Sequence, residues 1–359
     1  MRDGWQETFQ LSLSMIRRRI IMEENQQSKT PQLGEYVYAY RISAMIHVAT
    51  ELNIADLLQD GPKDSHYLAV KTATHEPSLY RFLRALTAID LFQESENGFE
   101  LTDLSRFLLS DHPDSLQAVI HFACGELSWL TWGELLHVVK TGQPSFEKAF
   151  GMPKFDYFKT HPQAGKTFNT AMDTLTVYCI KDILAHYDFS ETECIVDIGG
   201  GVGRLLFSIL EKYPETHGIL HDLPHVVREA YPLRDQFGVE DRCQIIEGQF
   251  FESVPQGGDM YLLKWILHSW RDEHALQILQ NCAQAMNDTA KIVIFEGLIH
   301  DDFKSPDGKM FDVHLMAFYP EGKLRTQAEF SQLFQEAGLR LTRTVPLGNN
   351  LYAIEGTRS

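Results

Sequence analysis

A glycine-rich turn between an apolar strand and an amphipathic helix constrains the fold of this chain more than any other feature. The turn reads Asp197-Ile198-Gly199-Gly200-Gly201-Val202-Gly203, follows a strand expected over 194–196 and opens a helix expected over 204–212. Glycines at such a turn let the backbone approach a ligand closely, at the carboxyl end of the first strand of an α/β sheet. The turn therefore predicts a cofactor site in a domain of alternating strands and helices.

The spacing of the glycines indicates which cofactor binds. A dinucleotide site needs G-x-G-x-x-G, but the required third glycine is replaced by Arg204 in one register and by Leu206 in the other. The pattern that fits is acidic-x-Gly-x-Gly-x-Gly, with Asp197 before Gly199, Gly201 and Gly203. S-adenosylmethionine is cationic and carries no phosphate, so a carboxylate beside the loop attracts it. Asp222 ends the next strand, where a carboxylate can accept both ribose hydroxyls.

Strands and helices alternate through the C-terminal half. Strands are expected over 194–196, 218–220, 243–246, 259–263 and 291–296, with helices over 204–212 and 272–286. This alternation predicts a parallel, doubly wound, Rossmann-like α/β sheet. We expect three segments: an arm and dimerisation domain over 1–115, a helical connector over 116–190, and the cofactor-binding catalytic domain over 191–359.

The N-terminal segment has a winged-helix pattern. Helices are expected over 36–58, over 65–72 and from Pro77, followed by a hairpin whose turn is Ser95-Glu96-Asn97-Gly98. Residues 1 to about 32 are expected to form a mobile or partner-dependent arm. A winged helix either binds DNA or serves as a dimerisation module. The formal net charge of -17 repels phosphate backbones, so the charge favours the dimerisation interpretation, in which nucleic acid is not a partner.

Composition limits the remaining alternatives. The length of 359 residues predicts about two domains, and no apolar run reaches the roughly 18 residues of a membrane helix. The N-terminus lacks the apolar stretch and cleavage site of a signal peptide. Five cysteines lie far apart without a CxxC pair, which predicts reduced thiols in a cytoplasmic protein. The lack of a membrane-length apolar run predicts that a membrane is not a partner.

The ordered motifs make the chain resemble a known family. It is similar, from about Tyr40 to Tyr352, to the plant-type small-molecule O-methyltransferases, the group of the caffeic acid and acetylserotonin enzymes and their bacterial natural-product relatives. The matching segments are LYRFLRAL (79–86), FNTAM (168–172), DIGGGVG (197–203), DLPHV (222–226), LKWILHSW (263–270) and RTQAEF (325–330). The resemblance implies a winged-helix dimerisation domain and a catalytic domain of the class I S-adenosylmethionine-dependent methyltransferase fold. It also implies a homodimer and methylation of a hydroxyl on a small aromatic or polyketide-like metabolite.

The chemistry of this reaction calls for a base. A protonated phenol is a poor nucleophile, and a nearby base assists its attack on a sulfonium methyl group. His268 follows a strand at the carboxyl edge of the sheet, and the resemblance assigns it the role of general base. The resemblance also implies that Glu296 orients this histidine; a partner carboxylate holds the imidazole tautomer and stabilises the imidazolium.

The resemblance also carries over binding positions. Cofactor contacts are expected at Asp222, Gln249, Phe250 and Lys264, in addition to Asp197 and the loop glycines, with Phe250 against the adenine ring. Lys264 is alternatively a cap of the strand edge. Five positions correspond to the family's acceptor pocket, and each is also a plausible core residue: Phe168, Met172, Trp265, His314 and Leu315.

Three positions depart from the family pattern. Ser269 replaces an aspartate after the base histidine, Gln249 replaces an aspartate at the adenine contact, and Leu324 replaces a second carboxylate beside the base. These departures leave open methyl transfer by proximity alone. They also leave open a same-fold enzyme that binds the cofactor but catalyses hydroxylation or a pericyclic reaction.

No metal site is expected. His221 and His225 are separated by Pro224, which argues against a shared helical face, and the pair Asp301-Asp302 has the character of a solvated loop.

A winged-helix regulator that senses a metabolite is the remaining alternative, and it predicts salt-sensitive binding to duplex DNA.

Overall fold

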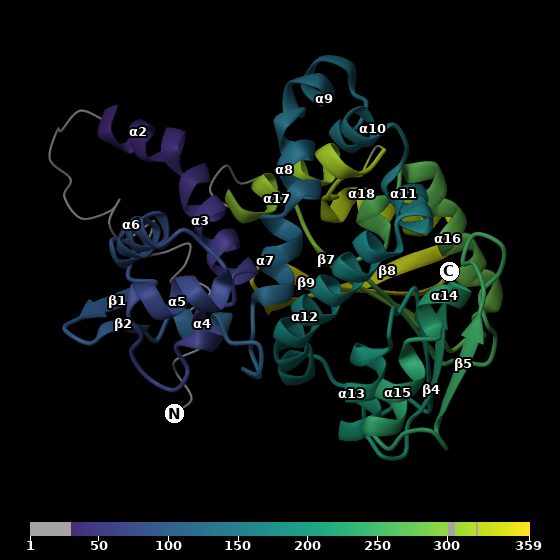
Figure 1. Ribbon diagram of the computed structural model, residues 1–359. Helices are drawn as coiled ribbons and strands as arrows, with labels where there is room; N and C mark the ends of the chain where they lie inside the picture. The colour runs from purple at the N-terminus through teal and green to yellow at the C-terminus, as the bar shows by residue number, and fades with distance from the viewer. Residues whose placement is uncertain (1–29, 301–305, 321) are drawn as a thin grey trace, which may run out of the picture. The chain divides into compact units, whose positions relative to one another are not determined.

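The computed structural model describes residues 30–300, 306–320 and 322–359 (Figure 1). It divides the chain into two compact units, one ending at Thr102 and one spanning Asp103–Ser359. The predicted N-terminal arm lies, up to residue 29, outside the described residues, as does the pair Asp301-Asp302. The three-segment division drawn from the sequence stays a prediction.

The first unit consists of short helices followed by a hairpin. Its elements are α2 (Thr30–Tyr38), α3 (Tyr40–Glu51), α4 (Ile54–Leu57), α5 (Ser65–Thr72), α6 (Glu76–Thr87), β1 (Phe92–Ser95) and β2 (Gly98–Leu101). The helix over 65–72 and the hairpin, in which Ser95 pairs with Gly98, agree with the sequence prediction. The single helix expected over 36–58 is wrong, because Asn53 adopts a left-handed φ of 49° that separates α3 from α4.

The second unit begins with helices. They are η1 (Ser105–Leu108), α7 (Gln117–Ala123), α8 (Glu126–Gly133), α9 (Leu135–Thr141), α10 (Ser145–Phe150), α11 (Lys154–Thr160) and α12 (Pro162–His186). Gly151 has a φ of 77° and ends α10, and Pro153 precedes α11, so the chain turns between these two helices. The helical character expected over 116–190 is found as far as His186, where α12 ends.

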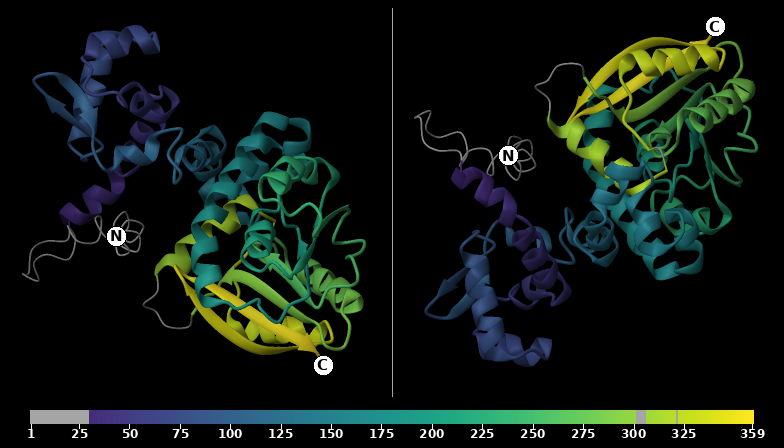
Figure 2. Two further views of the ribbon diagram at one scale, coloured as in Figure 1. Left: turned by 90° about the horizontal axis from the view of Figure 1, so that it is seen from below. Right: turned by 90° about the horizontal axis from the view of Figure 1, so that it is seen from above.

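A seven-stranded sheet follows, in the order β5-β4-β3-β6-β7-β9-β8. Its strands are β3 (Cys194–Ile198), β4 (His217–Asp222), β5 (Cys243–Glu247), β6 (Met260–Lys264), β7 (Lys291–Gly297), β8 (Leu339–Gly348) and β9 (Leu351–Arg358). The strands β3 to β7 pair in parallel as predicted, but β9 pairs antiparallel with β7 and with β8. The sheet is therefore mixed, with the β8–β9 hairpin (yellow) at one edge (Figure 2).

Helices cover both faces of the sheet, because alternate strand residues point to opposite sides. Leu262 and Phe295 belong to a core cluster with α12 and with α13 (Arg204–Lys212). Tyr261 and Ile294 belong to a second cluster with α16 (Asp272–Ala285) and α18 (Gln327–Glu336). The remaining elements are α14 (Pro224–Val227), α15 (Ala230–Gln236), η2 (Leu267–Ser269) and α17 (Pro306–Phe318). In the described ranges, no helix combines the length and apolarity needed to cross a membrane.

Candidate active site

The glycine loop after β3 is closely surrounded. Gly199, Gly201 and Gly203 have φ values of 66°, 64° and 83°, a region that favours glycine. A Cβ on Gly199 would lie 2.6 Å from the Ile266 side chain, and one on Gly200 would lie 2.5 Å from Asp197 Oδ2. Side chains at these two positions would therefore displace the loop or its carboxylate neighbour.

Asp197 is a buried carboxylate without a protein partner. Its residue is 1% exposed, and neither carboxylate oxygen has a hydrogen-bond partner among the described residues. Burial raises the pKa of Asp197 to about 7. A buried polar group is normally paired, so this carboxylate fits a ligand that brings a donor or a positive charge. The ammonium-bearing S-adenosylmethionine has that character.

Asp222 holds the loop in place. Its Oδ2 accepts a hydrogen bond from the Gly201 N–H at 2.8 Å, and its Oδ1 accepts one from the Leu223 N–H at 2.7 Å. Burial raises the pKa of Asp222. Each carboxylate oxygen has further lone pairs, so the group can also accept ligand hydroxyls.

The other predicted cofactor residues differ in their surroundings. Phe250 borders the loop, since a Cβ on Gly199 would lie 3.4 Å from its ring. Gln249 is exposed beside it. The Lys264 ammonium donates to Thr176 Oγ1 of α12 at 2.9 Å and lies 3.9 Å from the centre of the Trp265 ring. These contacts fit a strand-edge cap, and the charge of Lys264 also opposes the rise in the pKa of Asp197 that burial causes.

The next strand end bears the predicted base. The short turn η2 places His268 at the carboxyl edge of the sheet, 5% exposed. Glu296, near the end of β7 and 1% exposed, accepts the His268 backbone N–H at 3.0 Å. The imidazole Nδ1 lies 3.8 Å from Glu296 Oε1, beyond hydrogen-bond length, and has no hydrogen-bond partner in the described residues.

Burial controls the charge of both groups. Desolvation, followed by the charge of Lys154, lowers the pKa of His268. Burial raises the pKa of Glu296 to about 7, against the opposing effect of the His268 N–H. The imidazole is therefore neutral at physiological pH and has a free ring nitrogen.

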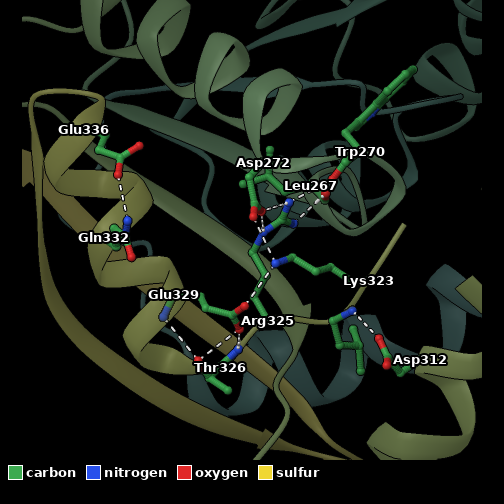
Figure 3. A network of polar contacts seen from close by, with 11 residues as sticks. Leu267, Trp270, Asp272, Asp312, Lys323, Arg325, Thr326, Glu329, Gln332 and Glu336 are labelled. Carbon is green, nitrogen blue, oxygen red and sulfur yellow. Dashed lines mark hydrogen bonds and ion pairs between the residues drawn. The ribbon is translucent and has the colours of Figure 1, made fainter. Parts of the chain in front are cut away.

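A buried arginine supports the His268 turn, and its role could not be assigned from the sequence (Figure 3). Arg325 Nη1 donates to the Leu267 carbonyl and Nη2 to the Trp270 carbonyl, each at 2.8 Å, while Nε donates to Asp272. These carbonyls flank His268 on both sides. The match of the Arg325-Thr326 motif was the only sign of this network in the sequence, because the acceptors are backbone groups.

The residue before the turn has an unusual backbone. Trp265 has a φ of 57°, an outlier for a bulky side chain, and its N–H donates to the Phe295 carbonyl at 3.0 Å. Such conformations concentrate at functional sites. The Trp265 ring packs with the cluster under α12 and α13, apart from the other predicted pocket residues.

Those other residues meet in an aromatic cluster between α12 and α17. Leu315 is a buried member, and Phe168 and Met172 pack against it. His314 stacks on Phe318 of the same cluster at 4.4 Å between ring centres. Lys154, which the sequence reasoning missed, is buried there too. Its identity gave no sign of burial, since lysine is almost always exposed.

These features define a class of protein. A sheet in this strand order, with a non-dinucleotide glycine loop after β3 and an acidic residue ending β4, is the class I S-adenosylmethionine-dependent methyltransferase fold. Residues 132–340 match the model of the O-methyltransferase domain, and residues 34–111 match that of the O-methyltransferase dimerisation domain. The chain belongs to this O-methyltransferase family.

Similar proteins agree. The phenazine O-methyltransferase PhzM of Lysobacter antibioticus is 38% identical over 90% of this chain and 94% of that protein. The structure of the mitomycin 7-O-methyltransferase MmcR superposes with a TM-score of 0.85 at 34% identity, covering 92% of this chain and 97% of MmcR. The structure of the O-methyltransferase NcsB1, in complex with S-adenosylmethionine and a naphthoic acid, superposes with a TM-score of 0.77 at 27% identity. The match covers 89% of this chain and 96% of NcsB1.

Several predictions from the sequence are thereby confirmed. They are the family, the fold class, the cofactor S-adenosylmethionine and the O-methyltransferase activity. The match of residues 34–111 favours the dimerisation interpretation of the N-terminal unit over the DNA-binding one. The roles of individual site residues stay predictions.

Proposed function

We propose that this O-methyltransferase acts on a hydroxyl of a small aromatic or polyketide-like metabolite, with His268 as the general base. The observation that carries this proposal is the position of a buried, neutral imidazole beside an aromatic cluster, with its Nδ1 on the side of Glu296. Its ring lies 5.6 Å from that of Phe311 and 6.4 Å from that of Tyr319. A planar acceptor suits such surroundings.

The cofactor site would use the loop and its neighbours. S-adenosylmethionine supplies an electrophilic methyl group when bound. The unpaired Asp197 carboxylate would receive positive charge, and Asp222 would accept hydroxyl donors while keeping its bonds to the loop backbone. The further proposed contacts are Gly199, Gly201, Gly203, Gln249, Phe250 and Lys264.

Proton removal would fall to His268. A neutral imidazole can take the proton of the acceptor hydroxyl as the oxygen attacks. The resulting imidazolium would lie beside Glu296, whose oxygen is 3.8 Å from Nδ1, so the new charge gains a counter-charge in a dry site. Leu324, at the position of the family's second carboxylate, is 3% exposed and packs in the aromatic cluster, so Glu296 would act alone.

The acceptor class is supported by related enzymes. Proteins 33–38% identical are named for phenazine, mitomycin and 3-amino-4-hydroxybenzoate, all of which contain cyclic conjugated rings. We propose that four residues contact such a ring: Phe168, Met172, His314 and Leu315. Trp265, whose ring packs with the other cluster, stays a prediction from the sequence. Ser269, in place of the family aspartate, is 7% exposed next to the base.

We also propose a homodimer. The helices α2 and α3 expose a row of apolar and aromatic side chains, which a solvated surface normally avoids. Val37 and Tyr40 are 57% and 53% exposed and lie in the segment that matches the dimerisation domain. A second copy of this chain would cover them. A cytoplasmic location stays a prediction.

One experiment tests the assignment of the base. The protein is incubated with methyl-labelled S-adenosylmethionine and a panel of hydroxylated phenazines, quinones and benzoates, and labelled product is counted. We expect transfer to at least one acceptor and a loss of about 10²–10⁴ in kcat for His268→Ala. Transfer by His268→Ala at the wild-type rate would reject the base assignment. Cofactor binding with turnover of an acceptor but no labelled product would favour the non-methylating alternative.

A further inference from the structure

Lys154 is a buried cation for which the described protein offers no anion. It is the first residue of α11, its residue is 2% exposed, and its ammonium has no hydrogen-bond partner among the described residues. Burying an unpaired charge is strongly unfavourable. A buried lysine of this kind is expected where a bound ligand supplies the opposite charge, and before the ligand binds, burial favours the neutral amine.

Aromatic rings surround this ammonium. It lies 3.6 Å from the centre of the Tyr319 ring and 4.4 Å from that of Phe168, with Phe155 and Phe318 at 5.2 and 5.6 Å. Ring faces attract a cation, but they offer no hydrogen-bond acceptor and replace only part of its hydration. Phe168 is one of the proposed acceptor contacts, so Lys154 lies at the same site.

In the part of the chain that the structure describes, the titratable groups facing Lys154 do not supply a negative charge. The charge of Lys154 lowers the pKa of His268 on η2 and that of His314 on α17, so both imidazoles are close enough to feel it. Glu296 is occupied by the backbone of the His268 turn. Burial alone accounts for the lowered pKa of Lys154, without an opposing carboxylate. Among the described residues, then, no carboxylate is paired with this ammonium.

We propose that Lys154 binds a carboxylate of the acceptor, so that the preferred substrates are hydroxylated aromatic carboxylates. This inference rests on the proposed acceptor site. The ring of such a substrate would lie among Phe168 and its neighbours, with the carboxylate on the ammonium and a hydroxyl within reach of His268. Lys154 is then a specificity residue, distinct from the base and from the cofactor loop.

Binding should be accompanied by proton uptake. Burial lowers the pKa of the Lys154 amine in the free site, and a bound carboxylate favours the ammonium, so binding takes up protons at a pH between the pKa values of the free and the bound amine. Calorimetry in two buffers of different ionisation enthalpy measures this uptake. The uptake should disappear in Lys154→Met and persist in His268→Ala, which separates the lysine from the imidazole.

The test uses the full chain with S-adenosylhomocysteine and two probes, 1-hydroxy-2-naphthoate and 1-naphthol. We expect wild type to bind the carboxylate at least about tenfold more tightly than the naphthol. Lys154→Met should lose at least about tenfold in affinity for the carboxylate and less than about twofold for the naphthol. Lys159→Met, an exposed lysine of the same helix paired with Asp156, is the matched control and should bind both probes like wild type.

Each other outcome overturns the inference. Equal losses for both probes in Lys154→Met would indicate a packing role or an action on the reacting hydroxyl. Unchanged carboxylate affinity, or no carboxylate binding by wild type, would exclude the proposed pairing. Retained affinity for S-adenosylhomocysteine shows that each variant is folded. Failure of the proposed function is distinguishable, because it would show as absent methyl transfer while the binding difference persists.

Discussion

Glu296 Oε1 accepts the backbone N–H of His268 at 3.0 Å, and the imidazole Nδ1 of the same residue lies 3.8 Å from that oxygen. The carboxylate therefore fixes the main chain of the turn in this structure, and its contact with the ring is electrostatic rather than a hydrogen bond. An orienting bond to the imidazole, expected from the sequence, stays a prediction. Glu296 accordingly has two separable roles, one as an acceptor and one as a charge.

Two substitutions of Glu296 separate these roles. Glu296→Gln keeps an oxygen that can accept the His268 N–H but removes the counter-charge for an imidazolium, so we expect kcat to fall about 10-fold or more with little change in cofactor affinity. Glu296→Ala also leaves the buried N–H unpaired and should cost a further 1–3 kcal/mol, roughly, in the free energy of unfolding. Steady-state kinetics and urea unfolding measure the two effects. Equal kcat for Glu296→Gln and wild type would exclude the charge role.

The pH dependence of turnover reports on His268. Burial lowers the pKa of its imidazole from the ordinary 6.5, so the base stays neutral, and competent, as the pH falls below that value. With saturating cofactor and acceptor, we expect protonation of the imidazole itself to leave kcat unchanged from about pH 7 down to about pH 5.5. Protonation of Glu296, whose pKa burial raises to about 7, removes the counter-charge in this range, so an acidic limb of wild type should be absent in Glu296→Gln. An acidic limb near pH 6.5 that persists in Glu296→Gln would contradict a desolvated base.

Asp197 should lower the stability of the free protein. Burial raises its pKa in the folded state from 3.8 to about 7, so between these values the folded state binds more protons than the unfolded state. Stability attributable to this group therefore falls as the pH rises from about 4 to about 7. Asp197→Asn removes this titration, so the variant should be more stable than wild type. The difference in the free energy of unfolding should reach its full size above pH 7, at up to about 4 kcal/mol.

The same variant should lose the cofactor. Added S-adenosylmethionine should raise the melting temperature of wild type but not that of Asp197→Asn, since only a ligand that binds the folded state stabilises it. Thermal unfolding at pH 5 and pH 8, with and without cofactor, measures both effects. A variant that is less stable than wild type at pH 8 would show that the carboxylate is paired in solution.

The proposed dimer predicts a change in mass. Val37→Asp places a charge in the exposed apolar row of α2, so we expect light scattering to shift from twice the chain mass toward 41.1 kDa. Val139→Asp is the control, because Val139 is 66% exposed on α9 and lies outside the dimerisation match. A monomeric wild type, or equal dissociation of both variants, would reject the assignment of this surface.

The sequence allowed the cofactor half to be predicted because its signals are local. Glycine spacing marked the loop, and apolar runs marked β3 to β7. The β8–β9 hairpin was missed, although Asn349 and Asn350, with φ values of 49° and 58°, form the left-handed pair that joins such strands. The roles of Arg325 and Lys154 were not predicted for another reason. Arg325 is surrounded by carbonyls of a turn distant in the sequence, and Lys154 by aromatic rings from other segments, and no local sequence pattern encodes either environment.

Arg325 provides the strictest test of how the base is held. Its guanidinium is fully buried and joins the Leu267 and Trp270 carbonyls to Asp272, so it fixes both sides of the His268 turn (Figure 3). Arg325→Lys keeps the charge but cannot reach all three acceptors, and unpaired buried carbonyls should cost about 2–4 kcal/mol in the free energy of unfolding. Because the turn would then sample other positions, we expect kcat to fall about 10–100-fold with cofactor affinity unchanged.

Lys323→Met is the matched control for Arg325→Lys. Lys323 pairs with the same Asp272 and with Glu329, but its side chain is 36% exposed, so the loss should be no more than about 1 kcal/mol and kcat should stay near that of wild type. A purely structural role of Arg325 would lower stability and leave kcat of the folded fraction unchanged, whereas a positioning role lowers kcat at temperatures where the variant is fully folded. Kinetics well below the melting transition therefore decide whether the arginine holds the catalytic turn or only the fold.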